Sequence, residues 1–305
     1  MRSGFNRAVR RSGGRAVREC LSAVLLLSAG PAVRLTAQGG GGVEGLAVRF
    51  ASMTAVTGFE QAMGDSLLAL LPGSSRDRLG NVTLALGHGA PRRLATCGLD
   101  EAGYVVGGIT DGGYLTLRRV GARVAYPLFD QQLEGQRVTV FGANGAVPGV
   151  VAVKSVHLTR GRAAGPDAPF TVDNAYVDVG AATRAEVQAL GVGVLAPVAL
   201  AKRPTVYGDR LLAAPVAGRR AACAALAAAV AAQPRVQGTV VVAFTVQSLY
   251  GANAGLSTVR ALQGPFAEIK QASLTARYPD TAVETVALAQ ADSLAHALVT
   301  WMEGR

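Results

Sequence analysis

The sequence predicts an α/β protein with a small all-β domain inserted into it. Residues 238–246, GTVVVAFTV, form an apolar, β-branched run that is typical of a buried strand. The run follows an alanine-rich segment at 217–233, AGRRAACAALAAAVAAQ, that favours a helix. Residues 103–169 differ, because short runs rich in Val and Tyr alternate there with glycine-bearing turns, which indicates a small barrel or sandwich. The α/β domain therefore spans 39–102 and 170–305, and 103–169 is the insert.

The first part of the α/β domain reads as a helix followed by two strands. Thr57 and Glu60 have the spacing of a capping box, in which each side chain bonds the backbone of the other residue at a helix start. The helix continues to Pro72, and strands are expected in RDRLGNVTLALG (76–87) and RRLATCGL (92–99). The second strand ends at two adjacent carboxylates, Asp100 and Glu101. A strand end of this kind is where functional groups collect in α/β proteins.

The remaining elements follow the same reading. In the insert, strands are expected in YVVGGI, YLTLRRV, RVAYPLF, RVTVFG, VPGVVAV and SVHLTR. After residue 169 the chain returns with a strand in NAYVDVGA, a short helix in TRAEVQALG and an extended segment in VLAPVALAK. The last element is an amphipathic helix, QADSLAHALVTWMEG.

The first 38 residues predict an export signal. A basic segment precedes the apolar run CLSAVLLLSAG, which is too short to span a membrane, and LTAQ supplies small residues near a cleavage point. Residues 1–38 hold seven arginines and one glutamate, so they contribute +6 of the net charge of +10. The remaining +4 is ordinary and has no basic stripe with aromatics, which argues against nucleic-acid binding. We expect a bacterial periplasmic or extracellular protein without a membrane span after signal removal.

Removal of the leader leaves two cysteines, Cys97 and Cys223. An oxidising compartment permits a bridge between them, but two cysteines do not form a disulfide framework. The sequence favours two separate buried thiols, with pairing left open.

The order of the segments resembles the glutamyl and deblocking aminopeptidase family, co-catalytic dizinc exopeptidases with an inserted β domain. Six segments carry the resemblance, in the family's order: VTGFE, DRLGNV, GLDEAGYVVGGITDGGYLTLRRVG, NAYVDVGAATRAEVQALGV, FTVQ and ARYPDTAVETV. The resemblance implies a zinc-exopeptidase-like fold, a three-layer αβα sandwich with a mixed sheet, plus a small inserted barrel. It also implies homo-oligomers, because the insert serves oligomerisation in the family.

The positions that match the family's metal ligands have lost their donor groups. The first histidine corresponds to Gly98, the bridging aspartate to Val216, the glutamate pair to Ser248 and Leu249, and the last histidine to Asp280. Asp100 alone keeps the family's residue, which there orients a zinc-bound histidine. Glycine, valine and leucine side chains offer no lone pair to a metal, so the sequence predicts no cofactor, although the family uses two zinc or cobalt ions. His88, His157 and His296 are expected at surfaces or interfaces rather than as ligands.

Two other uses of the vestigial residues stay open. Ser248 could act as a nucleophile, but no histidine is placed to serve as its base, and Asp100 or Asp280 would be a weak one. Asp100 and Asp280 could instead hold one calcium or magnesium ion with backbone carbonyls. The favoured interpretation is an exported pseudoenzyme that binds a peptide or a related peptidase subunit. The alternative is an active metallo-aminopeptidase or hydrolase with a rebuilt site.

Overall fold

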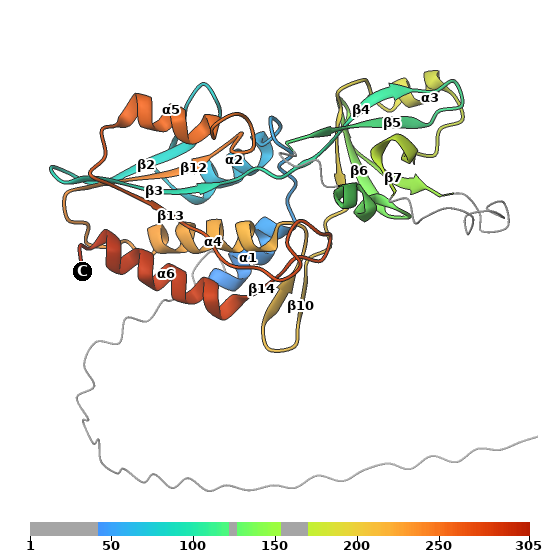
Figure 1. Cartoon of the computed structure of the whole chain (residues 1–305). Helices are drawn as coiled ribbons and strands as arrows, with labels where there is room; N and C mark the ends of the chain where they lie inside the picture. Colours follow the sequence, from blue (N-terminus) through green and yellow to red (C-terminus); the bar gives the residue numbers. More distant parts are fainter. Residues whose placement is uncertain (1–41, 122–126, 154–169) are drawn as a thin grey trace, which may run out of the picture. The chain divides into compact units, whose positions relative to one another are not determined.

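A mixed five-stranded sheet forms the centre of the α/β domain. The computed structural model describes residues 42–121, 127–153 and 170–305. The sheet has the order β1 (Ser75–Arg76), β2 (Val82–Gly87), β12 (Thr239–Thr245), β3 (Arg92–Gly98), β13 (Glu268–Gln271) (Figure 1). β12 is antiparallel to β2 and parallel to β3, and β13 is parallel to β3. The carboxyl ends of β12 and β3 therefore lie side by side, with Thr245 paired with Gly98.

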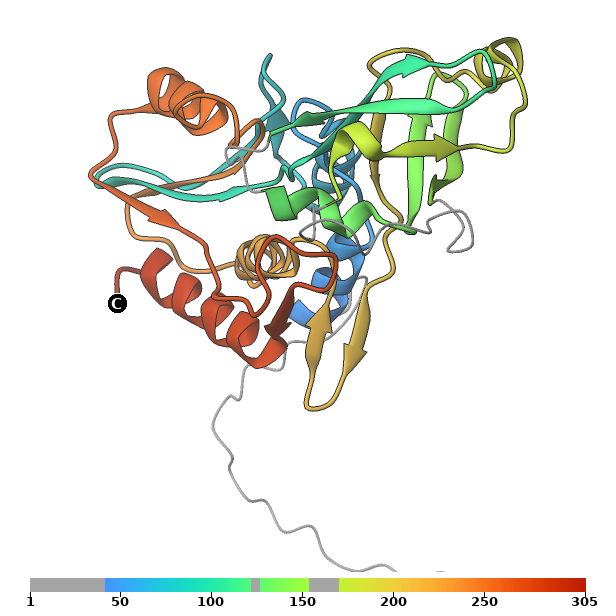
Figure 2. The same ribbon diagram turned by 45° about the vertical axis from the view of Figure 1, so that its right-hand side comes forward.

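Helices cover both faces of this sheet. α1 (Val43–Ala51), α4 (Ala217–Ala231) and α6 (Leu288–Met302) lie on one face, and α5 (Ala254–Gln263) lies on the other (Figures 1 and 2). α2 (Gln61–Leu70) packs beside β1 and β2. The predicted three-layer αβα sandwich is thus confirmed. α1 was not anticipated, because its short segment follows a glycine run that predicts a linker.

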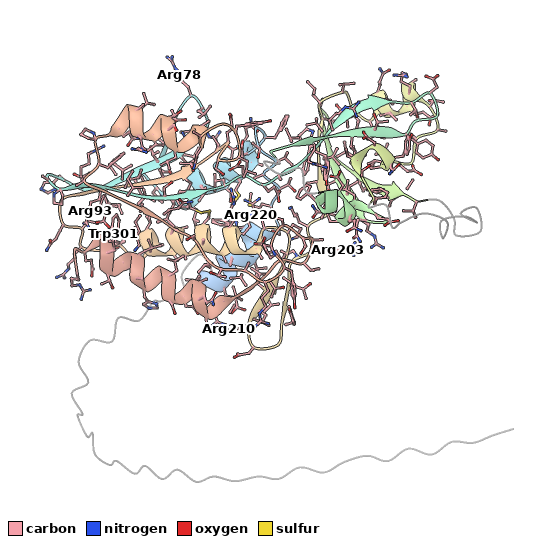
Figure 3. All side chains as sticks on the ribbon, viewed as in Figure 1. Arg78, Arg93, Arg203, Arg210, Arg220 and Trp301 are labelled. Carbon is pink, nitrogen blue, oxygen red and sulfur yellow. A yellow bond between two sulfur atoms is a disulfide. The ribbon has the colours of Figure 1, made fainter. Side chains whose placement is uncertain are left out.

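The alanine content of α4 explains its central position. Alanine has the highest helix propensity and a small side chain, so a helix rich in it forms readily and can approach a sheet closely. Nearly every residue of α4 from Ala217 to Val230 is buried. The exception to this apolar packing is Arg220, which is completely buried and is labelled in Figure 3. A buried guanidinium requires compensating acceptors, and these lie at the end of β3.

The inserted domain is a closed barrel with its own apolar core. Its strands follow the order β4 (Gly103–Ile109), β5 (Leu115–Val120), β8 (Tyr176–Asp178), β7 (Gly145–Ala152), β6 (Arg137–Gly142), β9 (Pro197–Leu200). Alternating residues such as Leu115, Leu117, Val138 and Val140 fill the interior. The short helix α3 (Arg184–Ala189) precedes β9. The predicted small barrel is confirmed.

The barrel extends further along the chain than the predicted end at residue 169. β8 and β9 complete its sheet, although their sequence pattern, a strand, a short helix and an extended segment, reads as part of the α/β domain. Periodicity alone cannot show which sheet a three-residue strand joins. RVAYPLF, expected as a strand, ends instead in a 3-10 helix at Pro127–Leu133. Its residues 123–126, the segment SVHLTR and the leader lie outside the described residues.

A further small sheet joins β10 (Thr205–Tyr207), β11 (Leu211–Ala213) and β14 (Thr285–Ala287). It places the segment around Asp280 beside the start of α4, because β11 precedes α4 and pairs with β14. No helix among the described residues combines the length and the apolar character needed to cross a membrane.

Candidate functional site

Asp100, which follows β3, is the centre of a hydrogen-bonded cluster at the strand ends. It is completely buried, and each of its carboxylate oxygens accepts two contacts. Oδ1 accepts from Ser248 Oγ at 2.5 Å and lies 3.5 Å from Arg219 Nη1. Oδ2 accepts from Thr57 Oγ1 at 2.9 Å and from the Leu249 N–H at 3.0 Å. The structure thus brings together two of the vestigial residues, Asp100 and Ser248, and saturates the carboxylate with protein donors.

Arg219 supplies the cation of this cluster from the first turn of α4. Its Nη1 donates to Ser248 Oγ at 2.7 Å in addition to the contact with Asp100. The side chain is 33% exposed, so the guanidinium is held on one side and open on the other. Cys223 lies one helical turn further along α4 and is joined by a disulfide to Cys97 of β3. The preference for two separate thiols is therefore wrong, because the close packing of α4 brings the two Cα atoms to 5.5 Å.

A second ionic cluster is formed by Glu101, Lys202 and Arg220, next to the first cluster in the chain. Glu101 contacts Lys202 Nζ and lies 3.3 Å from Arg220 Nη2, and it accepts the Ala55 N–H at 3.0 Å. The three ionic side chains are between 0% and 6% exposed. Burial opposes the charge on Glu101, but Lys202 and Arg220 together hold its pKa below the ordinary value. Burial lowers the pKa of Arg220, whose Nε has no hydrogen-bond partner among the described residues.

The predicted capping box is wrong, because both of its residues serve the site instead. α2 begins at Gln61 after Glu60, without a side-chain cap. The Thr57 hydroxyl donates to Asp100, and Glu60 Oε1 accepts the Gln247 N–H at 2.8 Å. Burial raises the pKa of Glu60 above its ordinary value. Two residues with the spacing of a local motif therefore bind partners that lie far away in the sequence.

Two adjoining cavities open at the cluster. The first, which we call the polar cavity, has a volume of about 470 Å³ and is lined at the strand ends by Thr96, Gly98, Thr245, Ser248 and Gln271. The second, which we call the apolar cavity, has a volume of about 510 Å³ and is lined by Tyr104, Phe129, Leu200, Pro215 and Leu249, among others. Val216, Arg219, Leu249, Pro279 and Asp280 line both. Arg219 therefore faces the boundary between a polar and an apolar compartment of one cleft.

Four of the eight described non-glycine residues with positive φ lie in or next to the lining of the cleft. Val216, Gln247, Asn253 and Asp280 have φ between 50° and 61°, the left-handed region that non-glycine residues rarely adopt. A β-branched residue such as Val216 is especially disfavoured there. Strained residues of this kind cluster at ligand sites, where the surrounding structure holds them.

The positions matched to metal ligands converge at one place. Gly98, Val216, Ser248, Leu249 and Asp280 all line the polar cavity. Asp280 is exposed, and its carboxylate makes no hydrogen bond to a described residue, while both oxygens of Asp100 are taken by protein donors. A single cation shared by these two aspartates thus finds no support. His88 and His296 are exposed, and His157 lies outside the described residues.

Several residues of the site were missed from the sequence. Arg219 and Arg220 are the only charged residues of α4. Charged side chains in a long alanine run indicate a site, because such a helix is expected to be buried and buried charges require partners. Lys202, Thr57, Glu60 and Thr96 give no comparable signal, because their partners come from distant segments.

Comparison with known proteins places the chain in a family. The profile of the family described as M42 glutamyl aminopeptidase matches residues 80–262, which is more than half of the chain. The chain belongs to this family. The Escherichia coli (strain K12) protein SgcX is 30% identical over 181 residues, 56% of this chain and 46% of the relative. Lysyl aminopeptidase of Pyrococcus furiosus is 31% identical over 126 residues, 40% of this chain and 35% of the relative.

Solved structures support the same fold. The TET1 peptidase of Pyrococcus horikoshii superposes with a TM-score of 0.69 at 20% identity, over 83% of this chain and 97% of that chain. The chain spans less than half the length of the curated relatives it matches. The resemblance stated from the sequence is confirmed.

The prediction that no cofactor is needed is contradicted by this membership, because M42 aminopeptidases are metal-dependent enzymes. The residues that the structure describes do not, however, fit a metal centre. They contain no group of three or more His, Cys, Asp or Glu side chains that could hold an ion. A Cβ added at Gly98 would lie 2.9 Å from Ser248 Oγ and 3.2 Å from Arg219 Nη1. The space for a ligand at position 98 is filled by these two side chains, so no chemical step is derived through a metal.

Proposed function

We propose that this chain is an exported M42-family protein that binds peptides in the cleft without hydrolysing them. The observation that carries the proposal is the Asp100–Ser248–Arg219 cluster. Hydrolysis of a peptide bond requires a base that can accept a proton from water or a hydroxyl. Asp100 has four protein donors around it, and Glu284, a buried carboxylate that lines the polar cavity, accepts the N–H groups of Gly218 and Asp280. Asp280, the remaining carboxylate of that cavity, is exposed.

The cleft retains the properties of a binding site. Its two cavities, of about 470 and 510 Å³, each fall within the size range of ligand pockets, roughly 300–1,000 Å³. Apolar walls and a few fixed polar groups provide the combination that such pockets use for affinity and orientation. Peptides are the ligand class that family membership favours.

Export is supported by two independent features. The first 38 residues have the layout of a secretory signal. The Cys97–Cys223 bridge is buried, and bridges of this kind persist in oxidising compartments such as the periplasm. We expect export in Escherichia coli to give mature protein with blocked thiols, and retention of the unprocessed chain in the cytoplasm would contradict it.

A homo-oligomer is part of the proposal. The Pyrococcus horikoshii TET1 peptidase, whose fold this chain shares, is reported to assemble into a tetrahedron or a large octahedral shell. Light scattering on the mature protein is expected to give a mass of two or more chains, and a monomer at micromolar concentration would contradict the expectation.

The function itself is tested by measuring turnover and binding on the same preparation. Aminoacyl-nitroanilides and short peptides are incubated with the protein, with and without added Zn²⁺ or Co²⁺, while calorimetry measures peptide binding. We expect binding without turnover under each condition. Turnover that is lost on chelation would overturn the proposal, and so would the absence of both activities.

A rebuilt hydrolase is a second candidate, because Ser248 Oγ lies 2.5 Å from Asp100 Oδ1. A carboxylate is a weak base toward a hydroxyl, and this one already accepts three further contacts. Ser248→Ala separates the two candidates. The hydrolase predicts that this variant loses activity on an ester and peptide panel, whereas the binding protein shows no activity to lose.

A further inference from the structure

The guanidinium of Arg219 has donors left over. Nη1 is engaged by Ser248 and Asp100, but no hydrogen bond joins Nε or Nη2 to any described residue. The side chain is 33% exposed and lines both cavities. Since a planar guanidinium presents a fork of parallel donors, the free side is suited to a carboxylate.

The carboxylates around the cleft, in contrast, are mostly occupied. Asp100 accepts from Ser248, Arg219, Thr57 and Leu249, and Glu101 is paired with Lys202 and Arg220. Glu284 accepts two backbone N–H groups. Among the described residues that line the cleft, Asp280 alone offers a carboxylate without a hydrogen bond, and it is exposed at the rim. The inner cleft is thus built to receive an anion rather than an amine.

The apolar cavity, which Arg219 also lines, indicates that the group next to the carboxylate of the ligand is apolar. Tyr104, Phe129, Leu200, Pro215 and Leu249 are among its lining residues, and a volume of about 510 Å³ accommodates a large aliphatic or aromatic side chain. A molecule that places an anion at Arg219 and extends an apolar group from the adjacent atom fits both compartments.

We infer that the cleft binds the free α-carboxylate of a C-terminal residue with an apolar side chain. Arg219 holds the carboxylate through Nε and Nη2, the apolar cavity takes the side chain, and the preceding peptide extends into the polar cavity. This inference rests on the proposed peptide-binding function and specifies which end of the peptide is recognised.

The test compares acetyl-Ala-Ala-Leu carrying a free carboxylate with the same peptide as its C-terminal amide. Calorimetry on the mature protein is expected to show the free acid binding about ten- to hundredfold more tightly, the range for hydrogen bonds to a charged group. Free leucine and acetyl-leucine form two further arms, which separate a single amino acid from a peptide as the source of the carboxylate.

Two substitutions address the residues. Arg219→Gln is expected to remove the preference for the free acid, and Arg260→Gln, which removes an exposed arginine of α5 outside both cavities, is expected to retain it. A second variant, Asp280→Asn, keeps the inference testable if the Arg219 variant does not fold. It should fold, because asparagine tolerates the left-handed backbone at this position. The substitution removes a negative charge near the bound carboxylate and should increase the affinity for the free acid severalfold, whereas it would lower the affinity for a peptide bound through its N-terminal amine.

The outcomes separate the inference from the proposed function. Equal affinity for acid and amide, or weaker binding by Asp280→Asn, overturns the inference and leaves peptide binding intact. Turnover of either peptide overturns the proposed function. Binding of free leucine alone contradicts the extension of a peptide into the polar cavity.

Discussion

Two neighbouring ion pairs, built from successive residues, have opposite surroundings. Asp100 and Glu101 follow β3, and Arg219 and Arg220 lie in the first turn of α4. Asp100 pairs with Arg219, whose side chain is 33% exposed to the cleft, whereas Glu101 pairs with Arg220, which is 0% exposed. The same chemistry thus occurs once with a partly exposed arginine at the cleft and once with a fully buried arginine, whose partners Glu101 and Lys202 reach the wall of the apolar cavity.

The difference in burial indicates which ion pair stabilises the fold and which one is available to bind a ligand. The Glu101 cluster contains two cations and one anion whose side chains are at most 6% exposed, so each partner depends on the others. Arg219 keeps free donors because one side of its guanidinium is exposed to the cleft. We therefore expect changes in the first cluster to appear in stability and changes in the second to appear in binding.

The largest expected effect comes from breaking the buried cluster. Glu101→Gln leaves Lys202 and Arg220, whose side chains are at most 6% exposed, without a counter-charge. Loss of one partner of a buried pair costs about 3–5 kcal/mol. Urea unfolding of the variant and its parent, followed by circular dichroism, measures the difference in unfolding free energy.

The matched control is the exposed pair between Asp111 and Arg184, whose side chains are 100% and 51% exposed. Asp111→Asn removes the same kind of charge and should cost less than about 1 kcal/mol. Equal losses in the two variants would show that burial does not distinguish the clusters.

The next largest effect is expected from the disulfide, which fixes the α4 turn after Arg219 to the end of β3. Cys97→Ala with Cys223→Ala opens a loop with a sequence separation of 126 residues. Removal of a native bridge is expected to cost about 2–4 kcal/mol. Thermal unfolding with and without reductant checks this, since the parent should lose stability in reductant and the double variant should not respond. If reductant did not change the thermal stability of the parent, the presence of the bridge would be contradicted.

The sequence predicted the framework of this site better than its contacts. The strand ending at Thr245 and the strand ending at Gly98 follow from apolar runs, which are local signals. The resemblance then grouped Gly98, Val216, Ser248 and Asp280, which the structure places around one cavity. Asp100 was singled out, although its four donors come from three separate segments and could not be foreseen.

Local patterns failed where distant partners compete. Thr57 and Glu60 have the spacing of a capping box, but they contact Asp100 and Gln247. The bridge between Cys97 and Cys223 depends on how closely α4 packs against β3, and no pattern of spacing contains that distance. Arg219 and Arg220 were visible as charges in an alanine helix, but only their burial shows their different roles.

A smaller effect is expected at Val216, which precedes α4 as its N-cap residue, lines the cleft and has a φ of 51°. Glycine adopts this conformation without the clash of a Cβ, whereas alanine retains the clash. Val216→Gly should therefore be more stable than Val216→Ala by about 1 kcal/mol. The comparison of two truncations cancels the loss of the valine side chain, and denaturant midpoints measure it. Equal stability would show that the cleft side of α4 carries no backbone strain.

The smallest effect is expected at Glu60, and it depends on pH. Burial raises the pKa of this carboxyl above its ordinary value of 4.5, so the folded protein binds the proton more tightly than the unfolded chain. The resulting stabilisation is complete below pH 4.5 and is lost as the pH rises through the folded-state pKa. Glu60→Gln keeps an acceptor for the Gln247 N–H and removes the charge. Melting temperatures are measured from pH 4 to 8. The melting temperature of the variant relative to that of the parent should increase as the pH rises, and a constant difference would contradict the raised pKa.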